Sequence, residues 1–218
     1  MIKHTATYFV RTIAFCDGAT DDPDKGHICG RPFGLAYDPI ARLLYIADAY
    51  YGLLVADSNG RLAKQIATGA EGQPFVFCNG LDIDPITRNI FFTDTSAVYD
   101  LRSSFVNLQY LQNSTKGLQA NDSTGRLLKY DVRTNQVTVL MRNLSGAAGL
   151  VETAAATVTQ GSQTPVPIRV RVDGSGTISE TVSLEAQYGS TPISEAQQSG
   201  LSVYVSSRGV NFVGVYSP

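Results

Sequence analysis

The chain has 218 residues with a formal net charge of -2, and 43% of them are hydrophobic against 17% charged. This balance is typical of a globular domain and excludes a disordered or fibrous chain. The charge gives no general attraction to nucleic acid or to an anionic membrane surface, and no apolar run approaches the roughly 20 residues of a membrane span. The 11 Tyr, 9 Phe and 20 Gly favour strands joined by tight turns.

The first feature along the chain is a turn-rich loop between two cysteines. Residues 17–23 are rich in Gly, Asp and Pro, and Cys16 and Cys29 flank them. A disulfide closing a loop of this size contributes about 3 kcal/mol in the chain-entropy model. The third cysteine, Cys78, is expected to be a small buried hydrophobic residue.

A repeat then sets the expected fold. Residues 34–48 (GLAYDPIARLLYIAD) and 80–94 (GLDIDPITRNIFFTD) share Gly-Leu, Asp-Pro-Ile, Arg and a final Asp at an offset of 46 positions. A strand-rich period of about 40 to 50 residues is typical of β-propeller blades.

Each repeat predicts a run of strands and turns. In the first we expect a half-buried strand at 35–37, a turn at Asp38-Pro39, a buried strand at 43–47, a hairpin turn at 57–60 and a returning strand at 61–67. In the second we expect strands at 89–93, 126–131 and 137–141, with a polar insertion at 101–121 lying over one face.

A third, weaker unit predicts strands at 169–173, 201–205 and 212–216. Before it, residues 151–167 are rich in Ala, Thr, Gln, Ser and Pro without periodicity, as in a linker. The sequence therefore divides into propeller blades at 1–150, a linker at 151–167 and a C-terminal blade at 168–218.

Several of these segments together resemble the strictosidine synthase-like proteins of plants. They are Cys29–Leu35, Tyr45–Leu53, Phe91–Ser96, Thr124–Asp131, Pro192–Glu195 and Phe212–Tyr216. The resemblance implies an all-β, six-bladed propeller of the strictosidine synthase-like and paraoxonase-like superfamily. Six blades at this period exceed 218 residues, and the match passes from Leu150 directly to the C-terminal blade. We therefore expect an incomplete ring that lacks N-terminal and internal blades.

The resemblance also implies an activity: the Pictet-Spengler condensation of an arylethylamine with an aldehyde in alkaloid biosynthesis, without a cofactor. One buried carboxyl group moves the protons, and its position falls on Glu195. Pocket positions fall on Phe33 and Phe77, which also fit ordinary blade core, and on Arg208, where the enzyme has an aliphatic residue. A His that precedes the catalytic segment in the enzyme is replaced by Ile193.

The wider superfamily includes calcium-dependent lactonases and esterases, so a metal site also has to be considered. Asn79, which we place in the pocket, matches one calcium ligand, but the partner position holds Ala148, which cannot ligate a metal. With two His and no Cys-x-x-Cys in the chain, a zinc site is not expected either. We expect no metal site.

Two classes of function stay open: an enzyme of the strictosidine synthase or related hydrolase type, and a non-catalytic remnant or binding module. The expected partner is a small-molecule substrate, with possible self-association through exposed strand edges. The resemblance pairs Cys16 with Cys29 and places the protein in the secretory pathway, the vacuole or the extracellular space, although no signal peptide is visible at the N-terminus. Three N-glycosylation patterns, at Asn113, Asn121 and Asn143, agree with that route.

Overall fold

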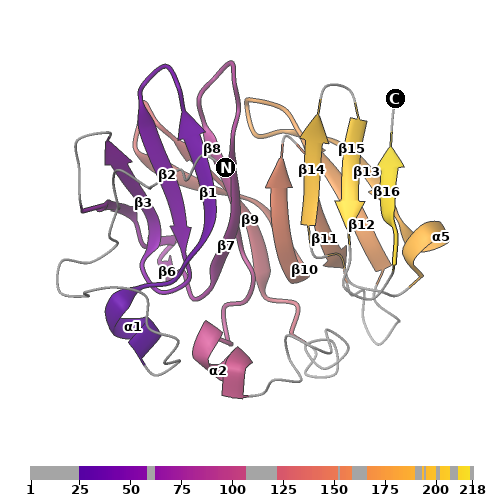
Figure 1. The fold of residues 1–218 in the computed structure, drawn as a ribbon, viewed down its shortest axis with the longest axis horizontal. Helices are drawn as coiled ribbons and strands as arrows, with labels where there is room; N and C mark the ends of the chain where they lie inside the picture. The colour runs from indigo at the N-terminus through magenta and orange to yellow at the C-terminus, as the bar shows by residue number, and fades with distance from the viewer. Residues whose placement is uncertain are drawn as a thin grey trace, which may run out of the picture.

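A computed structural model describes residues 25–57, 62–106, 122–151, 153–158, 166–189, 193, 195–199, 202–206 and 211–216. Strands dominate these residues, which confirms the predicted all-β class (Figure 1). The helices are short: α1 (Gly26–Cys29), α2 (Leu101–Val106) and α5 (Glu185–Tyr188). No helix in this described part of the chain has the length and hydrophobicity to cross a bilayer.

The first repeat forms a four-stranded antiparallel sheet in the order β1-β2-β3-β4. Its strands are β1 (Pro32–Asp38), β2 (Leu43–Asp48), β3 (Gly52–Asp57) and β4 (Lys64–Ala67), of which β1, β2 and β4 lie close to predicted positions. A two-stranded ribbon, β5 (Gly69–Ala70) and β6 (Gln73–Pro74), leads to the second repeat.

The second repeat opens a seven-stranded sheet in the order β13-β12-β11-β10-β9-β8-β7. Its strands are β7 (Cys78–Ile83), β8 (Ile90–Asp94), β9 (Gly125–Asp131), β10 (Gln136–Val151), β11 (Thr153–Val158), β12 (Val166–Val172) and β13 (Ile178–Ser183). The 16-residue β10 pairs with β9 in its first half and with β11 in its second, and Leu144 takes part in both pairings. Two four-stranded units therefore share one strand.

The change of partner along β10 occurs at irregular backbone. The register with β9 shifts between Met141 and Leu144, and the register with β11 shifts between Ser145 and Ala148. Asn143 and Gly146 have φ values of 59° and 62° there. Such bulges bend a strand and let it leave one sheet for the next.

The predicted linker at 151–167 does not match this arrangement, because β11 lies inside it and pairs with β10 and β12. The predicted C-terminal blade also divides differently. β12 and β13 belong to the seven-stranded sheet, whereas β14 (Glu195–Ser199), β15 (Ser202–Ser206) and β16 (Val213–Tyr216) form a sheet of their own. Residues 153–158 form a strand because neighbouring strands supply its hydrogen bonds, which composition alone does not reveal.

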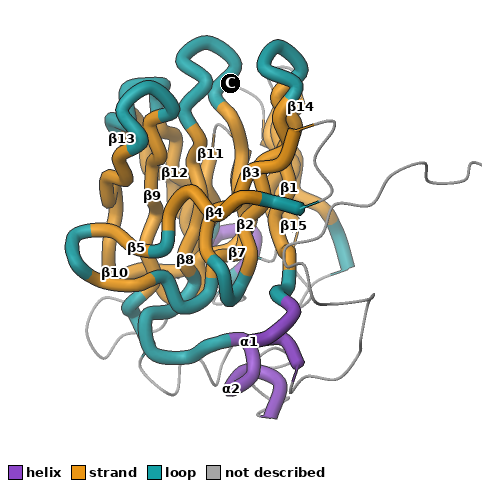
Figure 2. Tube along the Cα trace, turned by 90° about the vertical axis from the view of Figure 1, so that its left-hand side faces the viewer, coloured by secondary structure: helices purple, strands orange, loops and turns teal. Residues whose placement is uncertain are grey.

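The sheets pack side by side through their first strands. β1 contacts β7, β7 contacts β10, and β10 contacts β14. The backbones of β1 and β7 approach so closely that a Cβ on Gly34 would lie 2.4 Å from the carbonyl oxygen of Asn79. Antiparallel four-stranded sheets arrayed in this way through their inner strands form a β-propeller, in agreement with the prediction (Figures 1 and 2).

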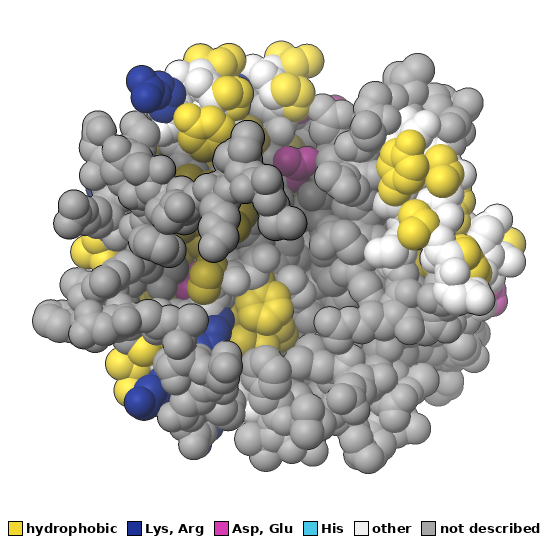
Figure 3. Space-filling model, in the orientation of Figure 1, with side chains coloured by type: hydrophobic (Ala, Val, Ile, Leu, Met, Phe, Trp, Pro, Cys, Tyr) yellow, Lys and Arg dark blue, Asp and Glu magenta, His cyan; other side chains and the backbone are white. Residues whose placement is uncertain are grey.

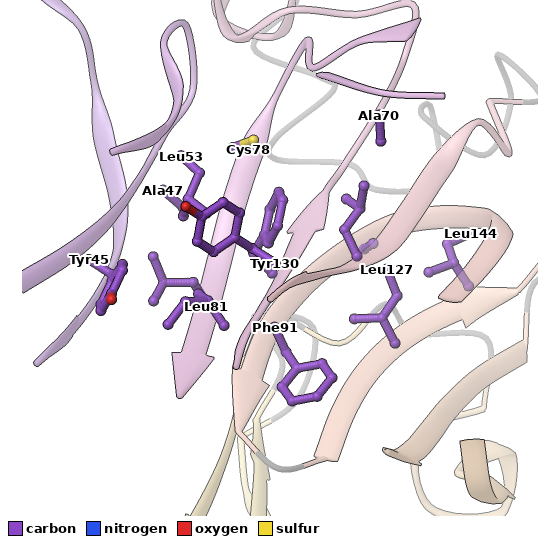
Figure 4. Packing of buried hydrophobic residues seen from close by; sticks show 14 of the residues in the cluster. Tyr45, Ala47, Leu53, Ala70, Cys78, Leu81, Phe91, Leu127, Tyr130 and Leu144 are labelled. Carbon is purple, nitrogen blue, oxygen red and sulfur yellow. The ribbon is translucent and has the colours of Figure 1, made fainter. Parts of the chain in front are cut away.

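The main hydrophobic core lies between these sheets. Figure 4 shows Tyr45, Ala47 and Leu53 of the first sheet on the same side of the core as Cys78 and Leu81 of β7. The cluster continues through Phe91, Leu127, Tyr130 and Leu144 of the shared sheet. A separate small core of Leu184, Tyr188, Ile193, Val203 and Val205 supports the last sheet.

Candidate functional site

The predicted site residues lie where the inner strands begin. In Figure 1 both β1 and β14 run upward, so Phe33 near the start of β1 and Glu195 at the start of β14 lie toward the lower end, which also holds α1 and α2. β7 runs parallel to β1, because Phe33 contacts Phe77 at one end and Asp38 pairs with Arg88 at the other. One end of the propeller thus receives residues from three separate segments.

Phe33 and Phe77 form an aromatic pair at this end. Their ring centroids are 5.3 Å apart at an interplanar angle of 84°, which is an edge-to-face contact. Phe77 is fully buried against Ala49 and Leu101, whereas Phe33 is 45% exposed. The Phe33 ring therefore rests against a buried aromatic partner and is partly open to solvent. In Figure 3 hydrophobic side chains are visible low on the same face.

Asn79 is held by a hydrogen-bond chain that the sequence does not predict. Its Nδ2 donates to Oγ1 of Thr95 at 3.2 Å, and that hydroxyl donates to the carbonyl oxygen of Ala147 at 2.7 Å. The chain joins β7, the end of β8 and β10. Because Nδ2 is used inside the protein, the Asn79 Oδ1 is the atom left to accept a hydrogen bond from a ligand.

A buried ion pair supports the loop that carries Phe77. Oδ1 of Asp94 accepts the backbone N–H groups of Val76 and Phe77, and Oδ2 pairs with Nη2 of Arg126 at 2.6 Å. Burial raises the pKa of Asp94, and the hydrogen bond from Arg126 opposes that rise. Sequence reasoning identified Asp94 only as a repeated residue; its agreement with Asp48 was the signal for a structural role.

The structure describes the remaining predicted site residues only in part. Glu195 begins β14, and its backbone pairs with Ser206, but its side chain lies outside the description. Arg208 lies outside the described residues. Ile193, at the position where the resemblance expects a His, is 5% exposed and packs in the small C-terminal core. The structure places Phe33 against Phe77 and holds Asn79 through Thr95, and the roles of these residues and of Glu195 stay predictions.

The secretory features are also only partly placed. Cys29 ends α1, while Cys16 lies outside the described residues, so their disulfide stays a prediction. Cys78 is free and fully buried, and burial raises the pKa of its thiol well above 9.0. Asn143 is exposed at the β10 bulge, whereas Asn113 and Asn121 lie outside the description. The described residues contain no group of three or more His, Cys, Asp or Glu side chains arranged to hold a metal.

Comparison with known proteins finds similarity to strictosidine synthases. The family model of strictosidine synthase matches residues 79–165. Strictosidine Synthase-Like 10 of Arabidopsis thaliana is 47% identical over 128 residues, which cover 59% of this chain and 32% of that protein. Strictosidine synthase of Catharanthus roseus is 35% identical over 136 residues, or 62% of this chain and 36% of the enzyme.

The chain is similar to strictosidine synthase and to strictosidine synthase-like proteins over about 60% of its length. It spans about a third of the length of the curated relatives it matches. Among solved structures, a gluconolactonase from Xanthomonas campestris aligns with a TM-score of 0.57 at 15% identity, over 87% of this chain and 59% of that one. This likeness supports the propeller fold alone.

Proposed function

We propose that this strictosidine synthase-like chain binds an arylethylamine at the lower end of the propeller and condenses it with an aldehyde. The observation that carries the proposal is the edge-to-face Phe33–Phe77 pair, in which Phe33 is 45% exposed and Phe77 is buried. The aromatic ring of the amine stacks on Phe33, and Oδ1 of Asn79 accepts a hydrogen bond from the amino group.

Glu195 is assigned the proton transfers. The amine attacks the aldehyde carbon, and loss of water, assisted by the carboxylic acid, leaves an iminium ion. The aromatic ring then forms a carbon–carbon bond to the iminium carbon, and the carboxylate takes the ring proton. Glu195 begins β14 at the same end of the propeller as Phe33, which supports this assignment. A general acid-base group contributes about 10²- to 10⁴-fold in rate.

A second candidate is binding without catalysis. Ile193 favours it, because a buried apolar side chain occupies the position at which the resemblance expects a His. Arg208 favours it as well, since a charge falls where the enzyme has an aliphatic pocket residue. In this case the arylethylamine site persists and the condensation does not.

Tryptamine is the probe that separates these candidates. The chain contains no Trp, so the fluorescence anisotropy of the indole reports binding without protein background. Phe33→Ala should weaken binding about tenfold, in line with the loss of an aromatic contact. Leu35→Ala is the matched control: it lies two residues further along the same strand, is 61% exposed, and should leave binding unchanged.

Turnover is measured by mass spectrometry as the product of tryptamine and an aldehyde less one water. Product formed by the wild-type chain and lost in Glu195→Gln supports the enzyme, because the substitution keeps the shape and removes the proton transfer. Binding without product supports the binding module. Absence of tryptamine binding, or equal binding by Phe33→Ala and wild type, contradicts both.

A further inference from the structure

Two hairpin tips at the upper end of the propeller carry large apolar side chains in solvent. Ile40 is 80% exposed in the turn between β1 and β2, and Ile86 is 88% exposed in the turn between β7 and β8. Each follows an exposed proline, Pro39 or Pro85. Figure 3 shows hydrophobic side chains gathered at the top of the molecule over these two hairpins, with a Lys or Arg side chain beside them.

The turns hide their own acidic groups. Oδ1 of Asp38 accepts the backbone N–H groups of Ile40 and Ala41, and Oδ1 of Asp84 accepts those of Ile86 and Thr87. Asp38 is only 3% exposed as a result. The hydrogen bonds that close the turns therefore occupy the carboxylates, while the isoleucine side chains lie in solvent.

The basic side chains of the two turns have different surroundings. Arg88 reaches back from the second turn and pairs with Asp38 of the first, which ties the two tips together. Arg42 holds the matching position in the first turn, with the same left-handed backbone, φ 57° against 68°, and it is exposed. The joined tips thus present isoleucine, proline and one exposed guanidinium.

The apolar surface stops at the next hairpin. The turn between β12 and β13 packs against the second tip, where Asn89 donates to the carbonyl oxygen of Gly174 at 3.0 Å. Its exposed residues are polar, with Asp173 bonded to Ser175 and Thr177. The turn beside them is therefore polar, and the first two tips are named here the tip pair (residues 39–42 and 85–86).

We propose that the tip pair binds an anionic lipid surface. Rigid tips with protruding isoleucines can enter the boundary between headgroups and acyl chains, and a neighbouring guanidinium can contact lipid phosphates. A protein partner is less favoured, because protein interfaces need a broad complementary area, and here two convex tips carry the apolar side chains. A lipid bilayer accommodates protruding side chains without a complementary pocket.

Tryptophan reporters test this surface directly. In the Trp-free chain, Ile86→Trp should shift its emission to the blue when vesicles of mixed phosphatidylcholine and phosphatidylserine are added, because the anionic lipid attracts basic residues. Val98→Trp is the matched control, since Val98 is 62% exposed and follows the far end of β8. Its emission should not move. An unshifted Ile86→Trp, or an equal shift in both variants, overturns the proposal.

Co-sedimentation with the same vesicles gives the second measurement. Ile40→Ser combined with Ile86→Ser should lower vesicle binding at least about tenfold, because two apolar side chains no longer leave water. Arg42→Gln should reduce the preference for phosphatidylserine about fivefold. Vesicle binding equal to wild type in the double variant contradicts the lipid surface. A blue shift of Ile86→Trp that depends on protein concentration alone points to a protein contact and contradicts it as well.

Discussion

The hairpins at residues 34–48 and 80–94 have the same sequence pattern and the same strands, but their surroundings differ. Leu81 in the second is 5% exposed, because the first sheet covers it. Leu35, its counterpart in the first, is 61% exposed. The repeat thus specifies each hairpin, whereas burial of its outer face depends on a preceding sheet.

The final aspartates of the two hairpins differ in the same way. Asp94 lies opposite Arg126 in the strand pairing and forms the buried ion pair. Asp48 lies opposite Gly52, and its Oδ2 is buried without a hydrogen-bond partner among the described residues. Asp48 therefore accepts the backbone N–H groups of Tyr50 and Tyr51 in its own turn, whereas Asp94 accepts those of Val76 and Phe77 in a separate loop and has a cation as partner.

The largest expected effect is a loss of stability when the cation that only Asp94 has as partner is removed. Arg126→Met should lower the free energy of unfolding by about 3–5 kcal/mol, because it leaves the Asp94 carboxylate buried without its partner. Urea denaturation followed by circular dichroism measures the change. Arg133→Met is the control: its side chain is 78% exposed and 3.7 Å from Asp131, so it should cost less than about 0.5 kcal/mol. Equal losses in the two variants would show that the buried pair has no special role.

The second effect concerns the two leucines. Leu81→Ala should destabilise the fold by about 2–5 kcal/mol, since a buried side chain leaves a cavity between the first two sheets. Leu35→Ala should change stability by less than about 0.5 kcal/mol. The same denaturation experiment compares them. A large loss of unfolding free energy for Leu35→Ala would mean that the side of β1 carrying Leu35 is covered in solution. The two hairpins would then not differ in burial.

The repeat explains how much of the fold could be predicted. Alternation, the Asp-Pro turns and the 46-residue offset predicted β1, β2 and β8 close to their observed positions, because these signals are local. β11 was missed, since its small and polar residues become a strand only through pairing with β10 and β12. The sharing of β10 between two units is likewise a long-range property that no local pattern carries.

In the candidate site, too, some residues could be predicted from the sequence and others could not. Phe33, Phe77 and Asn79 were predicted from the family resemblance; the structure places Phe33 against Phe77 and Asn79 against Thr95, and their role in binding stays a prediction. Thr95 and Arg126 were missed because each acts through a residue distant in sequence, Ala147 in one case and Asp94 in the other. The exposed tip pair was also missed: Asp-Pro-Ile predicts a turn, but the outward position of Ile depends on how Asp binds the backbone.

The smallest effect expected is on pH dependence. Burial raises the pKa of Asp94 above its ordinary value of 3.8 despite the opposing hydrogen bond from Arg126. The unfolded chain therefore releases this proton at lower pH than the folded chain does. By linkage, the contribution of Asp94 to stability is complete below about pH 3.8 and is lost as the pH rises through the folded-state pKa. Asp94→Asn should remove this fall in the free energy of unfolding across the acid range.

Asp131 gives a control of opposite sign. The backbone N–H of Arg133 holds the pKa of Asp131 below its ordinary value of 3.8. Its contribution is therefore present above that pH and is lost as the pH falls through the folded-state pKa. Asp131→Asn should make stability less sensitive to acid, whereas Asp94→Asn should make it more sensitive, because the opposing trend is gone. The contrary outcome is that the free energies of unfolding of Asp94→Asn and wild type run parallel between pH 3 and 6. In that case the pairing with Arg126 balances the effect of burial. The carboxylate of Asp94 is then no more costly to ionise than one in an exposed turn.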